Sequence, residues 1–121
     1  MKQKEPIHRS FGFAFKGLAH VLKERNFKLQ LVAAFIAIIL GFILNISCGE
    51  WISISICICF VLCLEMLNTV IEQTIDLLHP DWSEKAGKIK DISAGAVLVA
   101  ATTSVVVGGL IFIPKISAAM N

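Results

Sequence analysis

Three long apolar segments dominate this chain and restrict it to few folds. They cover about residues 29–47, 51–78 and 92–113, and each is long enough to cross a bilayer, which takes about 20 residues. The 121 residues are 56% hydrophobic and only 17% charged, whereas soluble domains are about 45–50% apolar. As core helices of a soluble protein, these segments would leave little chain to cover them. The sequence therefore predicts an all-α integral membrane protein with one domain over residues 1–121.

Lysine and arginine are distributed unevenly around the three segments. Seven precede the first segment, three lie between the second and third, and only Lys115 follows the third. Ten of the eleven thus share one side, which the positive-inside bias makes cytoplasmic. We expect a cytoplasmic N-terminus, an outer C-terminus and Trp51 at the outer interface. The basic residues of the cytoplasmic side are Lys2, Lys4, Arg9, Lys16, Lys23, Arg25, Lys28, Lys85, Lys88 and Lys90.

The stretch before the first segment, about residues 7–25, has the pattern of an amphipathic helix lying on the membrane surface. At 100° per residue its apolar side chains form one stripe, and four polar ones lie opposite. Phe13 departs from this pattern because it projects from the polar side. It can stack on a base or pack on a neighbouring helix, and its spacing does not decide between them. The stripe consists of Phe11, Phe15, Leu18 and Leu22.

The second segment carries a polar stripe in LEMLNTVIEQTID, residues 64–76. Glu65, Asn68, Glu72 and Asp76 fall within about 80° on a helical wheel. Charged groups within a membrane are costly, so such a stripe faces a bundle interior or a wet cleft. At the rise per residue of an α-helix, Glu65 lies about 21 Å from Trp51 along the helix axis. We therefore expect Glu65 in the cytoplasmic third of the bilayer, with Glu72 and Asp76 near the inner interface.

Depth suggests different chemistry for these carboxylates. The deeper Glu65 is desolvated, which suits a general base that works near neutral pH. The shallower Glu72 can stay ionised and hold Mg²⁺, which takes one or two protein carboxylates and completes its shell with phosphates and water. Glu24, at the end of the surface helix, is a candidate second ligand. Two alternatives use the same residues: ion pairs with Lys or Arg between subunits, and a path for protons or cations.

Cationic residues lie beside this stripe in the stretch 79–98. Lys88, Lys90 and Asp91 precede the third segment, where lysines can meet a polyphosphate as point charges. No glycine-rich phosphate loop of either standard form occurs in the sequence. The four cysteines have neither zinc-ligand spacing nor a paired disulfide pattern, so we interpret them as small apolar fillers. A buried base, shallow metal ligands and cations thus share one interface.

Two motifs, LEMLNTVIEQTID and KDISAGAVL, resemble those of the prokaryotic diacylglycerol kinase family, which includes undecaprenol kinases. FAFKGL and ERNF upstream match it in order and spacing, so the resemblance covers about residues 9–113. It implies a homotrimer in the bacterial inner membrane, with one surface helix and three membrane helices in each subunit. It also implies transfer of the γ-phosphate of ATP to a lipid hydroxyl at the cytoplasmic interface, with Mg²⁺ as cofactor. The implied partners are ATP, the lipid and other copies of the chain, with no nucleic acid.

The resemblance also implies residue roles. Glu65 corresponds to the catalytic base, and Glu24 and Glu72 to the metal ligands. Asn68 and Ala94 join Glu65 at the lipid-binding site, although some family members have Ser at the position of Ala94. The loop HPDWSEKAG departs from the Tyr-His pair that the family often has. The residues that correspond to nucleotide contacts are Phe13, Asp81, Trp82, Ser83, Lys90 and Asp91.

Two questions stay open at the level of sequence. The first is the acceptor, undecaprenol or diacylglycerol. ERNFKLQ resembles the undecaprenol branch, whose members often have His where this chain has Gln30. The second is whether the protein is an enzyme or a small oligomer that conducts protons or cations. In either case the three membrane helices of one chain are too few to enclose the stripe from Glu65 to Asp76. We therefore expect the site to lie between subunits.

Overall fold

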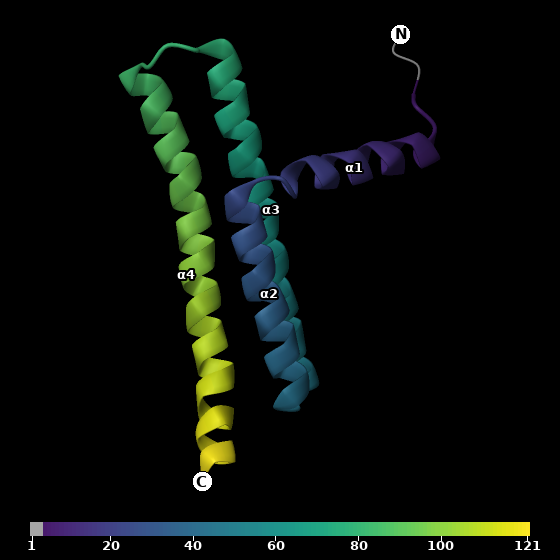
Figure 1. Ribbon diagram of the computed structural model, residues 1–121, viewed down its shortest axis with the longest axis vertical. Helices are drawn as coiled ribbons and strands as arrows, with labels where there is room; N and C mark the ends of the chain where they lie inside the picture. The colour runs from purple at the N-terminus through teal and green to yellow at the C-terminus, as the bar shows by residue number, and fades with distance from the viewer. Residues whose placement is uncertain (1–3) are drawn as a thin grey trace.

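The chain folds into four helices, and residues 4–121, the part described in the computed structural model, contain no strand. In order they are α1 (Ile7–Val21), α2 (Arg25–Ile43), α3 (Cys48–Leu78) and α4 (Glu84–Met120). Figure 1 shows α2, α3 and α4 running roughly along one direction while α1 lies across them. The predicted all-α architecture is confirmed, and Lys2 lies outside the described residues.

Helices α2, α3 and α4 are each long and apolar enough to span a membrane. In the most apolar stretch of α2, only 17% of the residues are buried within the chain. In the corresponding stretches of α3 and α4 the buried share is 22%. Their outward faces carry large apolar side chains such as Phe35, Phe60 and Leu110, at 62%, 61% and 73% exposure. A single chain thus leaves most of its apolar surface to lipid or to other subunits, as a membrane protein does.

The helices do not begin and end where the apolar segments do. α1 ends at Val21 rather than near residue 25, and α2 begins at Arg25, before the first apolar segment. α4 begins at Glu84 rather than near residue 92 and continues through Pro114 to Met120. These extensions place charged residues on the ends of membrane helices, where their side chains can reach the interface.

Side-chain caps explain where α3 and α4 start. Ser47 and Glu50 form a capping box at the start of α3, in which Ser47 Oγ accepts from Glu50 N at 3.2 Å and Glu50 Oε1 accepts from Ser47 N at 2.9 Å. Ser83 Oγ accepts from Ala86 N at 3.1 Å at the start of α4. Each bond satisfies an amide that the first helical turn leaves unpaired.

The link between α2 and α3 is a tight turn with specific requirements. Asn45 has a φ of 49°, and Ile46 N donates to the carbonyl of Gly41 at 3.2 Å, the geometry of a Schellman motif. Trp51 packs so closely on Gly41 that an added Cβ would lie 2.7 Å from its ring. Glycine is therefore required at position 41 for α2 and α3 to approach each other.

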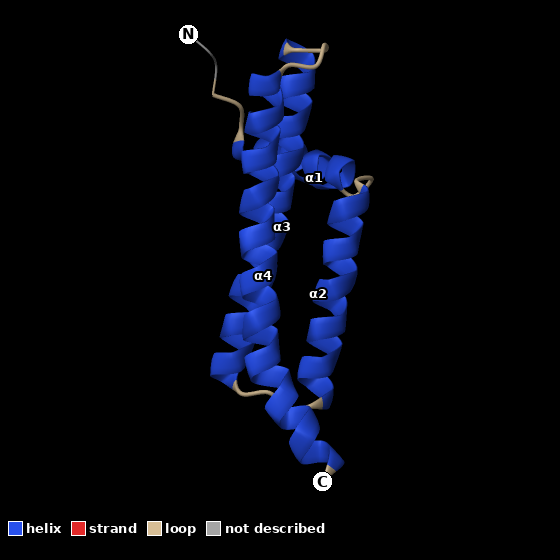
Figure 2. Cartoon of the chain, turned by 90° about the vertical axis from the view of Figure 1, so that its left-hand side faces the viewer, coloured by secondary structure: helices blue, strands red, loops and turns tan. Residues whose placement is uncertain are grey.

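The antiparallel helices α3 and α4 make the most extensive pairing in the chain, and Figure 2 shows α2 to one side of them. Both helices bury residues at intervals of seven. Small α4 side chains at this spacing allow close approach, and a seven-residue repeat produces a left-handed crossing. The seam consists of Ile54, Val61 and Asn68 on α3 and of Ala86, Ser93 and Ala100 on α4.

Ion pairs join the two ends of the α3–α4 seam. At one end Lys115 Nζ lies 3.2 Å from Glu50 Oε1. At the other end Lys90 Nζ pairs with Asp76 Oδ1. These contacts show how the two helices are aligned: Glu50 lies opposite Lys115, and Asp76 lies opposite Lys90.

Candidate active site

The polar stripe of α3 passes from a buried half to an exposed half. Glu65 is 3% exposed and Asn68 is 5% exposed, whereas Glu72 and Asp76 are exposed. A single chain therefore encloses Glu65 and Asn68, although we expected three helices to be too few for the whole stripe. The exposed half, with Glu72 and Asp76, remains open to a ligand or a neighbouring subunit.

Other polar side chains gather around the buried carboxylate. Glu24, Asn26 and Glu72 lie close enough to act electrostatically on Glu65. Glu24 occupies the N-cap position of α2, so the short turn between α1 and α2 brings it to the middle of α3. The structure thus brings three of the predicted residues, Glu24, Glu65 and Glu72, into one cluster. Sequence reasoning missed Asn26, although it belongs to the ERNF motif.

Asn68 connects the two halves of the stripe. Its Nδ2 donates to Glu72 Oε1 at 3.3 Å, while its Oδ1 is buried and has no hydrogen-bond partner within residues 4–121. Most buried polar atoms in proteins are paired, and leaving one unpaired destabilises the fold. This unpaired acceptor lies one turn from the buried Glu65 on α3, so the fold keeps a destabilising polar atom next to the candidate base.

The carboxylates fit a magnesium ion that is shared with phosphate groups. Within residues 4–121 no three His, Cys, Asp or Glu side chains come close enough to hold a metal by themselves. Mg²⁺ does not need such a set, because one or two carboxylates suffice when phosphates and water complete its shell. Glu24 and Glu72, which are exposed and act electrostatically on Glu65, supply this number.

A second group of predicted residues lines a pocket of about 270 Å³ at the α3–α4 loop. Lys90 is paired with Asp76 there, and Trp82 is 86% exposed. The N-terminus of α4 opens into the same region, and a helix N-terminus favours anions. The lining includes all five candidates of this region: Asp81, Trp82, Ser83, Lys90 and Asp91.

The structure leaves two predicted residues apart from these groups. Phe13 is 56% exposed on α1, which projects away from α3 and α4 (Figure 1). Lys16, on the same helix, has its Nζ 5.8 Å from the ring centroid of Phe13. Ala94 is exposed on α4 beside the buried Ser93. One chain therefore does not bring Phe13 to the loop pocket.

Comparison with known proteins identifies relatives along nearly the whole chain. Residues 12–112 match the prokaryotic diacylglycerol kinase family. Undecaprenol kinase of Bacillus subtilis (strain 168) is 40% identical over 109 residues, which are 89% of each chain. A diacylglycerol kinase of Synechocystis is 32% identical over 113 residues, 92% of this chain and 65% of the relative. Diacylglycerol kinase of Escherichia coli (strain K12) is 28% identical over 101 residues, 83% of each chain.

Proposed function

Because the chain belongs to the prokaryotic diacylglycerol kinase family and is a lipid kinase, we propose that it transfers the γ-phosphate of ATP to the hydroxyl of undecaprenol. Diacylglycerol is the second candidate acceptor. The greater identity to an undecaprenol kinase, 40% against 32% and 28% for two diacylglycerol kinases, supports this order. The observation that carries the proposal is the carboxylate of Glu65, which is buried on an apolar helix and feels the charges of the exposed Glu24 and Glu72.

Glu65 takes the proton of the lipid hydroxyl in this proposal. A base must lie within hydrogen-bonding distance of the proton it removes, and a lipid alcohol presents its hydroxyl at the membrane interface. The orphan Oδ1 of Asn68 can accept a hydrogen bond from the same alcohol and orient it. Phosphoryl transfer asks little covalent chemistry of a protein beyond such positioning and electrostatic stabilisation.

Glu24 and Glu72 would hold the magnesium ion, which when bound neutralises charge on the phosphates of ATP. The loop pocket would receive the nucleotide. Lys90 can bind a phosphate as a point charge once it leaves Asp76, and the exposed ring of Trp82 can stack on the base. Asp81, Ser83 and Asp91 complete that pocket.

We further propose a homotrimer in the bacterial inner membrane with the α3–α4 loop on the cytoplasmic side. The large uncovered apolar surface of α2, α3 and α4 supports assembly. The concentration of Lys and Arg near α1 and the α3–α4 loop supports the orientation. Because Phe13 lies far from the loop pocket of its own chain, the α1 that covers the nucleotide would come from a neighbouring subunit.

Purified protein in lipid vesicles, given γ-labelled ATP and one alcohol at a time, tests the proposal. We expect magnesium-dependent label in undecaprenyl phosphate, less in phosphatidic acid, and none after chelation of the metal. Transfer to neither lipid would overturn the proposal. Proton or cation flux through vesicles without ATP would instead support the conducting oligomer.

A further inference from the structure

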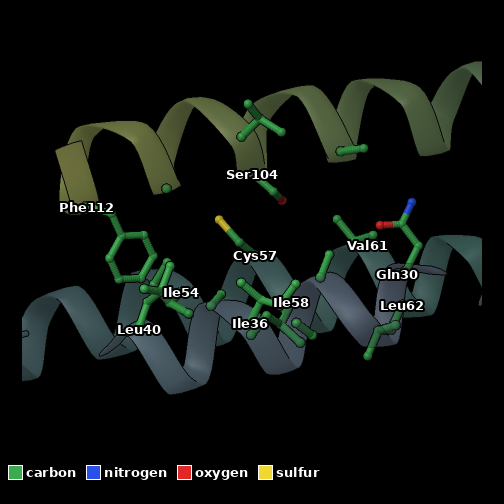
Figure 3. Close-up of a pocket in the computed structure, with 16 residues that line it drawn as sticks. Gln30, Ile36, Leu40, Ile54, Cys57, Ile58, Val61, Leu62, Ser104 and Phe112 are labelled. Atoms are coloured by element: carbon green, nitrogen blue, oxygen red, sulfur yellow. The ribbon is translucent and has the colours of Figure 1, made fainter. Parts of the chain in front are cut away.

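An apolar cavity of about 280 Å³ lies between α2, α3 and α4. We call it the interhelix slot. Figure 3 shows side chains from all three helices converging on it, with Leu40, Ile54 and Phe112 at one end and Gln30, Val61 and Leu62 at the other. Sequence analysis did not predict it, because periodicity on one helix does not show how three helices pack.

The interhelix slot begins next to the catalytic carboxylate of the proposed function. Val61, which lines its near end, is four residues from Glu65, or about 6 Å along α3. From there the slot follows the helices away from the α3–α4 loop. Along α4 it reaches from Ala101 to Phe112, about 16 Å at the helical rise. A lipid whose hydroxyl contacts Glu65 would thus have its chain directed into the slot.

The lining of the slot suits hydrocarbon. Ser104 is satisfied, since its Oγ donates to the carbonyl of Ala100 at 2.8 Å. Gln30 lies at the near end (Figure 3), where its amide borders the polar cluster. Apart from these two side chains and the thiol of Cys57, the lining is apolar. Cavities lined in this way stay dry and bind apolar molecules.

The size of the slot fits one chain. A cavity of about 150 Å³ binds benzene, so the 280 Å³ here corresponds to about ten carbon atoms. That is two isoprene units of a polyprenol, or about half of one fatty acyl chain. The slot has room for only one of the two acyl chains of a diacylglycerol, so the other chain would lie outside it.

We propose that the interhelix slot binds the hydroxyl-proximal ten or so carbons of a single-chain lipid alcohol, and so selects polyprenols over two-chain glycerides. The inference rests on the proposed function, since that function places the hydroxyl at Glu65. It extends the site to a lining on α2, α3 and α4 that determines specificity and does not touch the reacting atoms.

A matched pair of glycines allows a direct test. Gly108 lines the slot, and an added Cβ there would meet only Phe112, at 4.0 Å. Gly109 is next to it but lies outside the lining, and an added Cβ would meet only Ile113, at 3.7 Å. Gly108→Leu therefore fills the far end of the slot, while Gly109→Leu makes the same change of helix propensity on another face.

Activity on primary allylic alcohols of one to four isoprene units is the first readout. We expect Gly108→Leu to lower kcat/KM for alcohols of two or more units by at least about tenfold, the usual effect of shape changes in an apolar pocket, and to spare the one-unit alcohol. Gly109→Leu should match wild type at every length, and Ala101→Leu, at the near end, should impair all lengths. Equal profiles for the two glycine variants would overturn the inference.

A binding readout keeps the test independent of catalysis. Trp51 packs against the cluster of Ile54 and Phe112 at the far end of the slot. In a Trp82→Phe background, an alcohol brominated at its tenth carbon should quench Trp51 fluorescence, and Gly108→Leu should reduce the quenching while Gly109→Leu does not. If this contrast appears but wild type phosphorylates no alcohol, the slot stands and the proposed function fails. If the contrast is absent, the slot inference fails whatever the activity.

Discussion

Asn68 should serve function at a cost in stability. In the α3–α4 seam it continues the row of Val61, two turns away, and Ile54, four turns away, and it is 5% exposed. Its Oδ1 is unsatisfied, and its one bond, to Glu72, is long at 3.3 Å. Asn68→Leu would continue the apolar seam and remove both features.

The magnitude follows from these two opposing contributions. An unsatisfied buried acceptor costs about 1–3 kcal/mol, and a hydrogen bond to a charged group contributes about 1.5–3 kcal/mol. The long distance and the exposure of Glu72 put this bond at the weak end, because water can replace Asn68 as the donor. We therefore expect the free energy of unfolding of Asn68→Leu to stay unchanged or to rise by up to about 1.5 kcal/mol.

Activity should change in the opposite direction. Glu72 loses the donor that orients it, and removing the hydrogen-bond partner of a metal ligand typically lowers metal affinity or activity by about 10–100-fold. The assay pairs a melting curve in detergent with a magnesium titration of lipid phosphorylation. Thr69→Val is the control, because Thr69 donates to the backbone carbonyl of Glu65 and touches no carboxylate. Parallel losses of stability and activity in Asn68→Leu, or an unchanged magnesium titration, would refute the reasoning.

Three further predictions concern the same cluster. Glu24→Ala and Glu72→Ala should each shift the magnesium titration to higher concentration without lowering the melting temperature, whereas a structural ion pair would show the reverse. Because Glu24 and Glu65 come together within one chain, co-expressed Glu65→Gln and Glu24→Ala subunits should recover no activity, and recovery in proven hybrids would mean that a site draws these residues from two chains. Asp76→Asn should free Lys90 and lower the KM for ATP. The free energy of unfolding should change by less than about 1 kcal/mol, because the ion pair is exposed. A raised KM would mean that Asp76 orients Lys90 for the nucleotide.

The sequence predicts the helices well because their signals are local. The apolar lengths identify α2, α3 and α4, and the stripe from Phe11 to Leu22 identifies α1. The early start of α3 was also predictable, since Ser47 and Glu50 form the S-x-x-E pattern of a capping box. Ser83 shows the limit of assigning one role by resemblance, because its side chain caps α4 at a position expected to approach the nucleotide.

The packing between helices could not be read from the chain. The burial of Glu65 and Asn68 within one subunit depends on how α3 is aligned against α4. The ion pairs Lys90–Asp76 and Lys115–Glu50 show this alignment. The same packing creates the interhelix slot, where residues from three helices meet. Such features depend on distances between segments, about which helical periodicity contains no information.

The most direct test of the account measures phosphoryl transfer by Glu65→Gln. The substitution keeps the volume of a side chain that is 3% exposed, so fold, assembly and nucleotide binding should persist. Transfer of label from γ-labelled ATP to undecaprenol in vesicles should fall by about 10²–10⁴, the usual contribution of a general base. Label appearing in the lipid at a near wild-type rate, from protein with an unchanged melting curve, would contradict the central claim that the buried carboxylate of α3 is the catalytic base.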